Sequence, residues 1–494
     1  MSAAMIAGSA AMVTGCLNRP IERVEPRTTT TIVERLTQSS VDKIDLLLVI
    51  DNSRSMADKQ EILNLAVPDL VNELINPKCV DDNGMPLQAA QQPTDPLQDC
   101  PAGSQREFDP ILDIHIGILS SSIGSHGADA CDPAQMSNLN FSVNDKAHLI
   151  ERSGTDAGDP PVPTWEGKGF LAWDPSGEPH TSGPFSGPGE ADINNLTANV
   201  RAMVTGAGEV GCGYEATLEA WYRFLVDPTP YESITIDKNS AVLEGTDTVI
   251  VGDGPNNPGQ RQLFLRPDSL LAIIMLSDEN DCSIRDGGQF YFAAQLGNNF
   301  RLPRPRAACA TDPNDECCRS CGQGPGAGCS EAQDDCSTNL SLAEDHPNMR
   351  CFNQKQRFGI DFLYPTDRYV TGLTQFQVQD RFGNVADNPL FTDLLPGDEI
   401  SAVRDQGLVF IAGIVGVPWE DIARRNDAGL PDLINGLDSE GNVAGGFQSG
   451  IELAANDTWN LILGDPNCYA TDPNCRPEDP HMIESILPAA ARTP

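Results

Sequence analysis

Residues 44–55 read IDLLLVIDNSRS, and this stretch decides the fold. Residues 44–50 form a short, nearly continuous aliphatic run, which is typical of a strand buried on both faces of a parallel sheet. Polar residues follow at once. Apolar residues then recur at helical spacing from Leu63 to Leu74, with Pro68 expected to bend or divide that helix. The stretch therefore predicts a buried strand, a polar turn and a helix.

Similar apolar runs recur along the chain. Residues 111–119, 270–276 and 408–417 predict further buried strands, and residues 215–226 predict a helix with one apolar side. Aliphatic strands that alternate with helices predict an α/β fold with a doubly wound, mainly parallel sheet of the Rossmann-like kind. We expect helices on both faces of this sheet.

Long segments rich in Gly, Pro and Asp separate these elements. The longest are residues 124–200 and 282–400, and residues 309–351 are the richest in cysteine. We interpret them as cysteine-containing loop insertions at the ends of the sheet.

The composition restricts the classes of partner. The chain has 494 residues, 39% of them hydrophobic, which is enough for a substantial core, and a formal net charge of −39. Such a charge repels nucleic acid and anionic lipid headgroups. It is compatible with cation binding, although a well-solvated acidic surface is the simpler explanation.

The N-terminus has features of an export signal. The apolar run at residues 3–13 is far shorter than the ~20 residues that span a bilayer. It leads into VTGC at residues 13–16, which resembles a lipobox, so we expect residues 1–16 to be a lipoprotein signal peptide and Cys16 to carry the lipid. No basic residue precedes the run, and an ordinary buried cysteine is the alternative. Residues 17–43 are expected to tether a folded body to the cell envelope, as a membrane anchor rather than a membrane span.

The cysteine count agrees with export. The chain has 15 cysteines, and fourteen remain when Cys16 is set aside. An even number suits disulfide bonds in an oxidising compartment. The CCRSC cluster at residues 317–321 also resembles a zinc ligand set, but export favours disulfides there.

Oxygen-bearing side chains follow two of the predicted strands. Asp51, Ser53 and Ser55 have D-x-S-x-S spacing directly after the first strand, and Asp278 follows the strand at residues 270–276. Ligands bind at the carboxyl ends of strands in open α/β sheets. Carboxylate and hydroxyl oxygens suit Mg²⁺, with Mn²⁺ or Ca²⁺ as alternatives. Ser and Asp also serve as helix N-caps, but capping does not explain two acidic loops at one edge.

This pattern resembles the metal-ion-dependent adhesion site (MIDAS) of von Willebrand factor A (vWA) domains. The resemblance covers roughly residues 44–420, which leaves residues 421–494 as a C-terminal extension. It implies that Ser53 and Ser55 coordinate Mg²⁺ directly, that Asp51 and Asp278 lie close to the ion partly through water, and that a ligand carboxylate completes the octahedron. The segments FLRPDSLLAIIMLSDENDCS and GCGYEATLEA are similar to cysteine-containing vWA lipoproteins of Gram-negative bacteria.

The chain departs from the family at one ligand. The family places a threonine on a middle loop, and here that loop reads GCGYEAT at residues 211–217. Thr217 is a weak candidate for this ligand, because we expect it to lie inside the following helix. Cys212 and Cys282 each lie beside a predicted metal loop, and we hypothesise that they form a disulfide that clamps the two loops.

Three functions from different classes remain consistent with the sequence. The first is an envelope-anchored binding or adhesion protein whose Mg²⁺ bridges to a carboxylate on a protein or envelope component. The second is a structural or assembly factor of the envelope that uses the fold as a scaffold. The third is a metal-assisted hydrolase that uses Asp51 and Asp278. No G-x-S-x-G, H-E-x-x-H or phosphate-binding glycine loop occurs, so we expect the protein not to be an enzyme.

Overall fold

The structure is a computed structural model, and it describes most of the chain between residues 43 and 463. The predictions for residues 1–42, including Cys16, lie outside the described residues. The described ranges are 43–124, 144–154, 158–177, 187–209, 211–212, 214–237, 240–286, 301–341, 344–345, 350–351, 354–395, 403–417, 419–426, 428–432, 436–437, 443–448 and 450–463.

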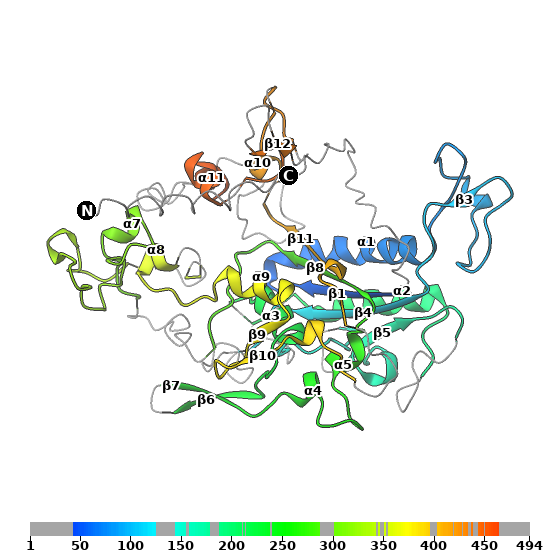
Figure 1. Cartoon of the computed structure of the whole chain (residues 1–494), viewed down its shortest axis with the longest axis horizontal. Helices are drawn as coiled ribbons and strands as arrows, with labels where there is room; N and C mark the ends of the chain where they lie inside the picture. Colours follow the sequence, from blue (N-terminus) through cyan, green and yellow to red (C-terminus); the bar gives the residue numbers. More distant parts are fainter. Residues whose placement is uncertain are drawn as a thin grey trace, which may run out of the picture. The chain divides into compact units, whose positions relative to one another are not determined.

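A central five-stranded sheet organises the fold (Figure 1). Its strands lie in the order β11-β8-β1-β4-β5. The first four are parallel, and β5 is antiparallel to β4. The strands are β1 (Lys43–Ile50), β4 (Asp113–Ser120), β5 (Phe170–Trp173), β8 (Leu270–Ser277) and β11 (Val409–Val415). The mixed α/β class and the mainly parallel sheet are therefore as the sequence predicts.

The central strand β1 is buried on both faces. Leu47 and Val49 belong to one apolar cluster, while Leu46, Leu48 and Ile50 belong to the other. Successive side chains of a strand point to opposite faces, so an unbroken aliphatic run is what a doubly covered strand requires.

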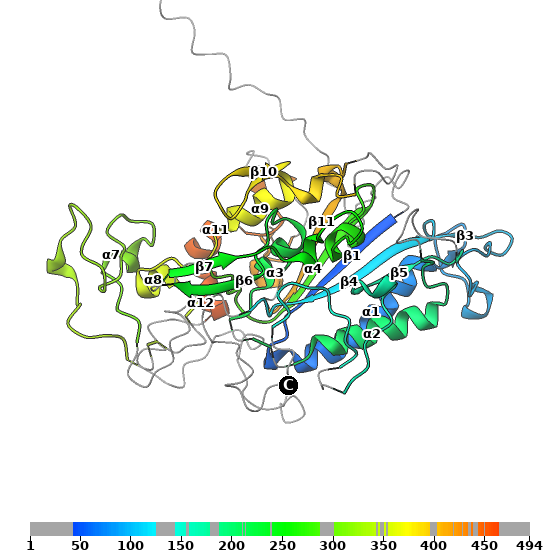
Figure 2. The same cartoon turned by 90° about the horizontal axis from the view of Figure 1, so that it is seen from below.

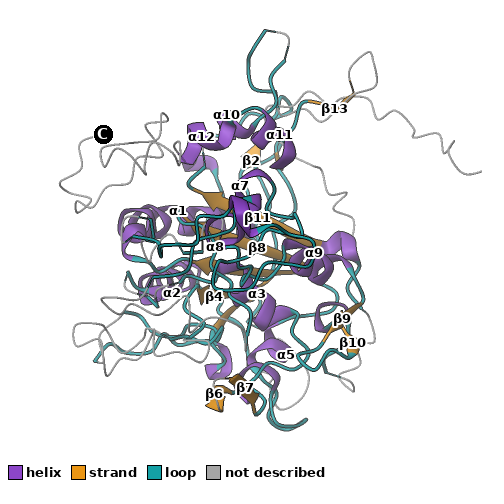
Figure 3. Ribbon diagram, turned by 90° about the vertical axis from the view of Figure 1, so that its left-hand side faces the viewer, coloured by secondary structure: helices purple, strands orange, loops and turns teal. Residues whose placement is uncertain are grey.

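Helices cover both faces of the sheet. The helices α1 (Ala57–Ile75) and α2 (Ile193–Ala207) pack side by side on one face (Figure 2). The helices α3 (Thr217–Leu225) and α5 (Gln260–Phe264) pack on the other, which Figure 3 shows edge-on. The helix α1 continues through Pro68 as a single element, so Pro68 does not divide it, which was one of the two predicted effects.

Two parts of the sheet differ from the sequence predictions. The strand β5 and the first half of α2 lie inside the segment predicted as an insertion, residues 124–200. The strand β11, predicted to be buried, is half-exposed, and Phe410 and Ile414 each keep 52% of their surface. Within the described residues β8 is its one pairing partner, so β11 is an edge strand.

Smaller elements complete the described chain. Four two-stranded ribbons pair β2 with β3, β6 with β7, β9 with β10 and β12 with β13. Their bounds are Cys79–Val80, Gln105–Arg106, Ser233–Asp237, Ser240–Glu244, Gln377–Gln379, Val385–Asp387, Gly436–Leu437 and Val443–Ala444. The short helices are α4 (Thr248–Val251), α7 (Ala308–Thr311), α8 (Gln354–Phe358), α9 (Thr366–Thr374), α10 (Trp419–Ile422), α11 (Gly450–Ala455) and α12 (Thr458–Leu463). None of the helices described is both long and apolar enough to span a bilayer.

The chain divides into two compact units. The unit that contains the sheet runs from Gln38 to Gly416, and the second unit begins at Val417. The second unit contains the β12–β13 ribbon and the helices α10 to α12. The candidate site described below lies wholly in the first unit.

The disulfide bonds confirm the prediction for the cysteine-rich segment. Among the described residues the pairs are Cys79–Cys100, Cys282–Cys351, Cys309–Cys318, Cys317–Cys329 and Cys321–Cys336. The hypothesised bond between Cys212 and Cys282 is wrong, because Cys282 pairs with Cys351. The chain after β8 runs beside residues 362–364, where Ile284 bridges to Leu363, and this path carries Cys282 toward Cys351.

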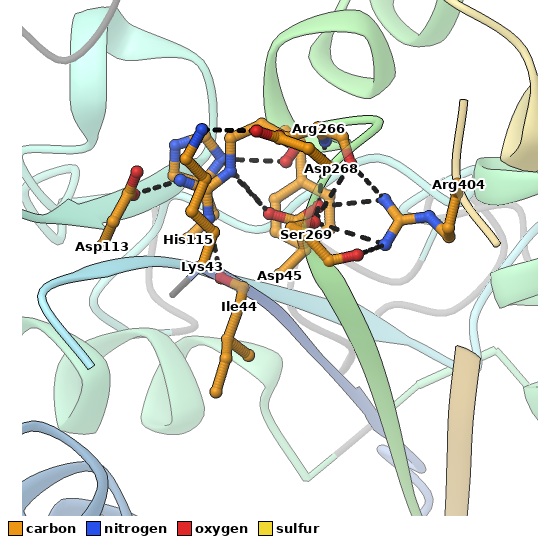
Figure 4. A network of polar contacts seen from close by, with 10 residues as sticks. Lys43, Ile44, Asp45, Asp113, His115, Arg266, Asp268, Ser269 and Arg404 are labelled. Carbon is orange, nitrogen blue, oxygen red and sulfur yellow. Dashed lines mark hydrogen bonds and ion pairs between the residues drawn. The ribbon is translucent and has the colours of Figure 1, made fainter. Parts of the chain in front are cut away.

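A buried polar network lies at the amino-terminal end of β1 (Figure 4). Its centre is the fully buried carboxylate of Asp45. The guanidinium of Arg266 lies 2.9 Å from one oxygen, and that of Arg404 lies 3.2 Å from the other. The hydroxyl of Ser269 donates to the second oxygen as well. The network joins β1 to the segments that precede β8 and β11, so it fixes the strand order at this end.

Replacing Arg404 with Met should therefore destabilise the protein by about 3 kcal/mol, because a buried carboxylate loses one of its two cationic partners. Urea unfolding measures this change. The matched control is Lys43→Met, which removes the partly exposed ion pair with Asp268 and should cost less than about 1 kcal/mol. Equal losses in the two variants would contradict the central role of Asp45.

Candidate functional site

Three loops meet at the carboxyl edge of the sheet because their strands are neighbours in register. Ile50, at the end of β1, pairs with Ser120 on one side and with Leu276 on the other. The amide of Asp51 still donates to the carbonyl of Leu276 at 2.9 Å. The chain crosses from β1 to β4 on one side and reaches β8 on the other, so the loops after β1 and β8 flank a topological switch point. Open α/β sheets bind ligands at such points.

Asp51 is fully buried at the centre of this edge. Its Oδ1 accepts a hydrogen bond from the Ser53 amide at 2.8 Å, and its Oδ2 accepts one from the Ser277 hydroxyl at 2.7 Å. Burial raises the pKa of Asp51, and the nearby charge of Asp278 raises it further, while the hydrogen bonds from Ser53 and Ser277 oppose the rise. The carboxylate is thus held in place by neutral donors.

The two serines of the D-x-S-x-S motif connect the first loop to the loop after β8. The Ser53 and Ser55 hydroxyls lie 3.0 Å apart. The Ser55 hydroxyl lies 2.9 Å from Asp278 Oδ1 and 3.2 Å from Glu279 Oε1. The structure therefore brings together all four strong candidates from the sequence, although the strands that position them are more than 200 residues apart in the chain.

Helix capping does not account for these serines. The residue at the N-cap of α1 is Met56, and it makes no side-chain capping hydrogen bond. The hydroxyls of Ser53 and Ser55 are instead directed at each other and at the second acidic loop.

Thr217 does not join this cluster. It is the first residue of α3 and is buried. The hydrogen bonds given by the structure for the described residues do not link it to Asp51, Ser53, Ser55 or Asp278. The weak expectation that Thr217 is a ligand gains no support from these contacts.

A second layer of polar contacts supports the motif from the loop after β4. Asn52 accepts hydrogen bonds from the hydroxyls of Ser121 at 3.2 Å and Ser122 at 2.9 Å. Gly211 approaches so closely that an added Cβ would lie 2.2 Å from Asn52 Oδ1, so only glycine fits there. The side chains of Asn52, Ser121 and Ser122 are buried, so their hydrogen bonds hold the backbone of the D-x-S-x-S motif in place.

Sequence reasoning missed two further charged groups. Lys59 of α1 places its ammonium 3.0 Å from Asp278 Oδ2 and 3.1 Å from the Ser55 carbonyl. Glu215 precedes α3, and burial together with the charges of Glu279, Asp51 and Asp278 raises its pKa to about 8. Its position just before the helix in GCGYEATLEA was the available signal for Glu215. Lys59 lies one helical turn beyond Ser55, which was the signal for that residue.

Carboxyl and hydroxyl oxygens, which are the ligand type of hard cations, meet at this edge. The carboxyl groups of Asp51 and Glu215 are buried here, and burial raises the pKa of both. Within the described part of the chain, no three His, Cys, Asp or Glu side chains are arranged to hold a metal ion among themselves. A cation at this edge would need the serine hydroxyls in addition to the carboxylates, and two such hydroxyls are present.

Comparisons with known proteins give no relative for this chain. No protein-family model, no curated protein and no solved structure matches it significantly. A functional proposal for the protein therefore depends on the geometry of this edge and on the motif.

The raised pKa of Glu215 should make the stability of the fold depend on pH. In the folded protein burial raises the pKa of this carboxyl to about 8 from an ordinary value of 4.5, so the folded state binds more protons between these two pH values. The contribution of Glu215 to the stability of the fold must then fall as pH rises from about 5 to 8. Glu215→Gln should remove that loss, so the variant should exceed wild type in stability at pH 8 and match it near pH 4.

Urea unfolding in the presence of a chelator, at pH 4, 6 and 8, measures this difference. The control is Glu209→Gln, which removes an exposed carboxylate on the loop after α2. An advantage of Glu215→Gln that is the same at every pH would show that the carboxyl is not held in its protonated form.

Proposed function

We propose that residues 43–416 form a vWA-like domain that binds a partner through a divalent cation, most simply Mg²⁺, held by Asp51, Ser53, Ser55 and Asp278. The observation that carries this proposal is the Ser55 hydroxyl, which lies 3.0 Å from Ser53 and 2.9 Å from Asp278. Two loops far apart in sequence thus present hydroxyl and carboxylate oxygens to one point, which is the ligand type that Mg²⁺ prefers.

Each residue has a distinct part in this proposal. Ser53 and Ser55 would bind the cation through their hydroxyls, and Asp51 and Asp278 would balance its charge. The bound ion would supply a positive centre that attracts a carboxylate of the partner. Mn²⁺ and Ca²⁺ are alternatives to Mg²⁺, because each also takes oxygen ligands.

We place the protein in the cell envelope, tethered by lipid at Cys16. The lipobox-like VTGC sequence supports this placement, and so do the disulfide bonds, because such bonds persist in oxidising compartments. The partner is then a protein or envelope component that offers an acidic group. A scaffold role in envelope assembly is the second possibility, and it differs in predicting cation binding without a cation-dependent partner.

Isothermal titration of the purified chain with Mg²⁺ tests the proposal. Wild type should bind one ion, and Asp51→Ala and Ser55→Ala should each weaken binding by at least about tenfold, because each removes an oxygen at the centre of the cluster. Ser55 is less buried than Asp51, so Ser55→Ala remains informative if Asp51→Ala fails to fold. EDTA should abolish capture of the partner from envelope extracts.

The control is Asp380→Ala, which removes a half-buried aspartate of the turn between β9 and β10. Its affinity for Mg²⁺ should equal that of wild type. The proposal is wrong if wild type does not bind Mg²⁺, Mn²⁺ or Ca²⁺, or if all three variants bind equally well. Ion binding without any EDTA-sensitive partner would favour the scaffold role.

A further inference from the structure

We propose that the Cys282–Cys351 disulfide positions the acidic loop of the candidate site, so that the affinity of the site for its cation depends on this bond. The proposal rests on the cation site proposed above. It assigns Cys282 and Cys351 as positioning residues that act through the loop containing Asp278, without touching the ion themselves.

The loop after β8 continues directly from the site to the disulfide. Asp278 and Cys282 are four residues apart, and the Cys282 side chain is 2% exposed. Cys351 lies 69 residues further along the chain and is also buried. The bond therefore links the loop after β8, at the carboxyl edge of the sheet (the rim), to the lobe formed by the described parts of residues 301–363. This lobe carries α7 and α8 and extends beyond the end of the sheet at which α1 begins (Figures 1 and 2).

The same loop holds the start of α3 in place. The Cys282 amide donates to the Glu215 carbonyl at 2.7 Å. Asp281 Oδ1 accepts a hydrogen bond from the Leu218 amide at 2.9 Å, and the Ser283 hydroxyl accepts one from the Glu219 amide at 3.0 Å. The residue at the N-cap of α3 makes no side-chain capping hydrogen bond. Asp281 and Ser283 therefore accept hydrogen bonds from the free amides of the first turn of α3, although they belong to another segment. A displacement of Cys282 would therefore move both the loop that contains Asp278 and the segment that contains Glu215.

On its other side, the loop is attached to a firm support. The Tyr364 amide donates to the Ser283 carbonyl at 3.0 Å, and the Arg285 amide donates to the Phe362 carbonyl at 2.9 Å. The two cysteines pack in a separate apolar cluster whose other buried members are Ile284, Leu302, Leu340, Phe358 and Phe362. Next to Cys351, the fully buried Arg350 forms an ion pair with the fully buried Asp345. Cys351 is thus anchored in the packed lobe, and the disulfide holds Cys282 and the loop that contains Asp278 against it.

The remaining disulfides of the lobe lack this connection. Cys309–Cys318, Cys317–Cys329 and Cys321–Cys336 close loops of 9, 12 and 15 residues inside the lobe. They stabilise the lobe without joining it to the rim. This difference provides a control within the same protein.

The test compares the Mg²⁺ affinity of the full chain in three double variants by isothermal titration. Cys282→Ala/Cys351→Ala removes the tie, and Cys282→Val/Cys351→Val removes it while keeping apolar volume in the buried space. Cys317→Ala/Cys329→Ala removes a disulfide that does not reach the rim. We expect the first two variants to bind Mg²⁺ about tenfold more weakly than wild type, as for the loss of other groups that orient ligands, and the third to bind as wild type does.

Each outcome decides one question. Unchanged affinity in the first two variants, with wild type binding Mg²⁺, overturns the positioning role alone. Restoration of affinity by the valine pair also overturns it, because packing rather than the covalent tie would then be responsible. Equal weakening in all three variants would overturn it too, because the loss of any disulfide would then have the same effect as the loss of Cys282–Cys351. If wild type does not bind the ion, the cation site and this inference fall together. If the alanine pair does not fold, the valine pair provides the measurement.

Discussion

The strand β1 is buried between β4 and β8 and pairs with both in a fixed register, and the rest of the structure depends on this constraint. Pairing on both sides continues to the last residue of β1, Ile50, and the Asp51 amide still bonds to the neighbouring strand. Three loops must therefore leave the sheet at the same level. A slip of one residue in a strand would turn its side chains to the opposite face. The aliphatic pattern that buries β1 thus also fixes where the carboxylate of Asp51 emerges.

The two ends of β1 carry buried carboxylates with opposite electrostatic surroundings. Asp45 is balanced by two guanidinium groups and a hydroxyl, which is how proteins make a buried charge tolerable. Asp51 has neutral donors and faces further acids, so burial raises its pKa. The first arrangement suits a fixed structural joint. The second leaves negative charge that a cation can compensate, and this contrast within one strand supports the assignment of function to the carboxyl edge.

Local patterns in the sequence predicted what depends on local physics. The aliphatic runs identified β1, β4 and β8, and they placed Asp51, Ser53 and Ser55 on the loop after β1, because strand burial and loop position follow from residues near in sequence. The strand β5 was missed since four residues, FLAW, carry no readable period within a segment rich in Gly and Pro. The partner of Cys282 was wrong because disulfide pairing depends on the path of the chain through space. Glu215 and Lys59 each carried a local signal, but their proximity to Asp278 depends on how the chain brings β1, α3 and β8 together.

The chemistry of the edge also bears on how firmly an ion would be held. Lys59 already provides a positive charge at 3.0 Å from one oxygen of Asp278, so an incoming cation has to compete with this ammonium for the same carboxylate. Glu215 would strengthen cation binding instead. Its ionised form adds negative charge near Asp51 and Asp278, and a bound cation would stabilise that ionised form. Hydroxyls rather than carboxylates supply half of the proposed ligands, so the two carboxylates of Asp51 and Asp278 would just balance the charge of a bound divalent ion. An acidic partner would then approach a site that is not negative, whereas a site of four carboxylates would keep a negative charge with the ion bound and would repel that partner.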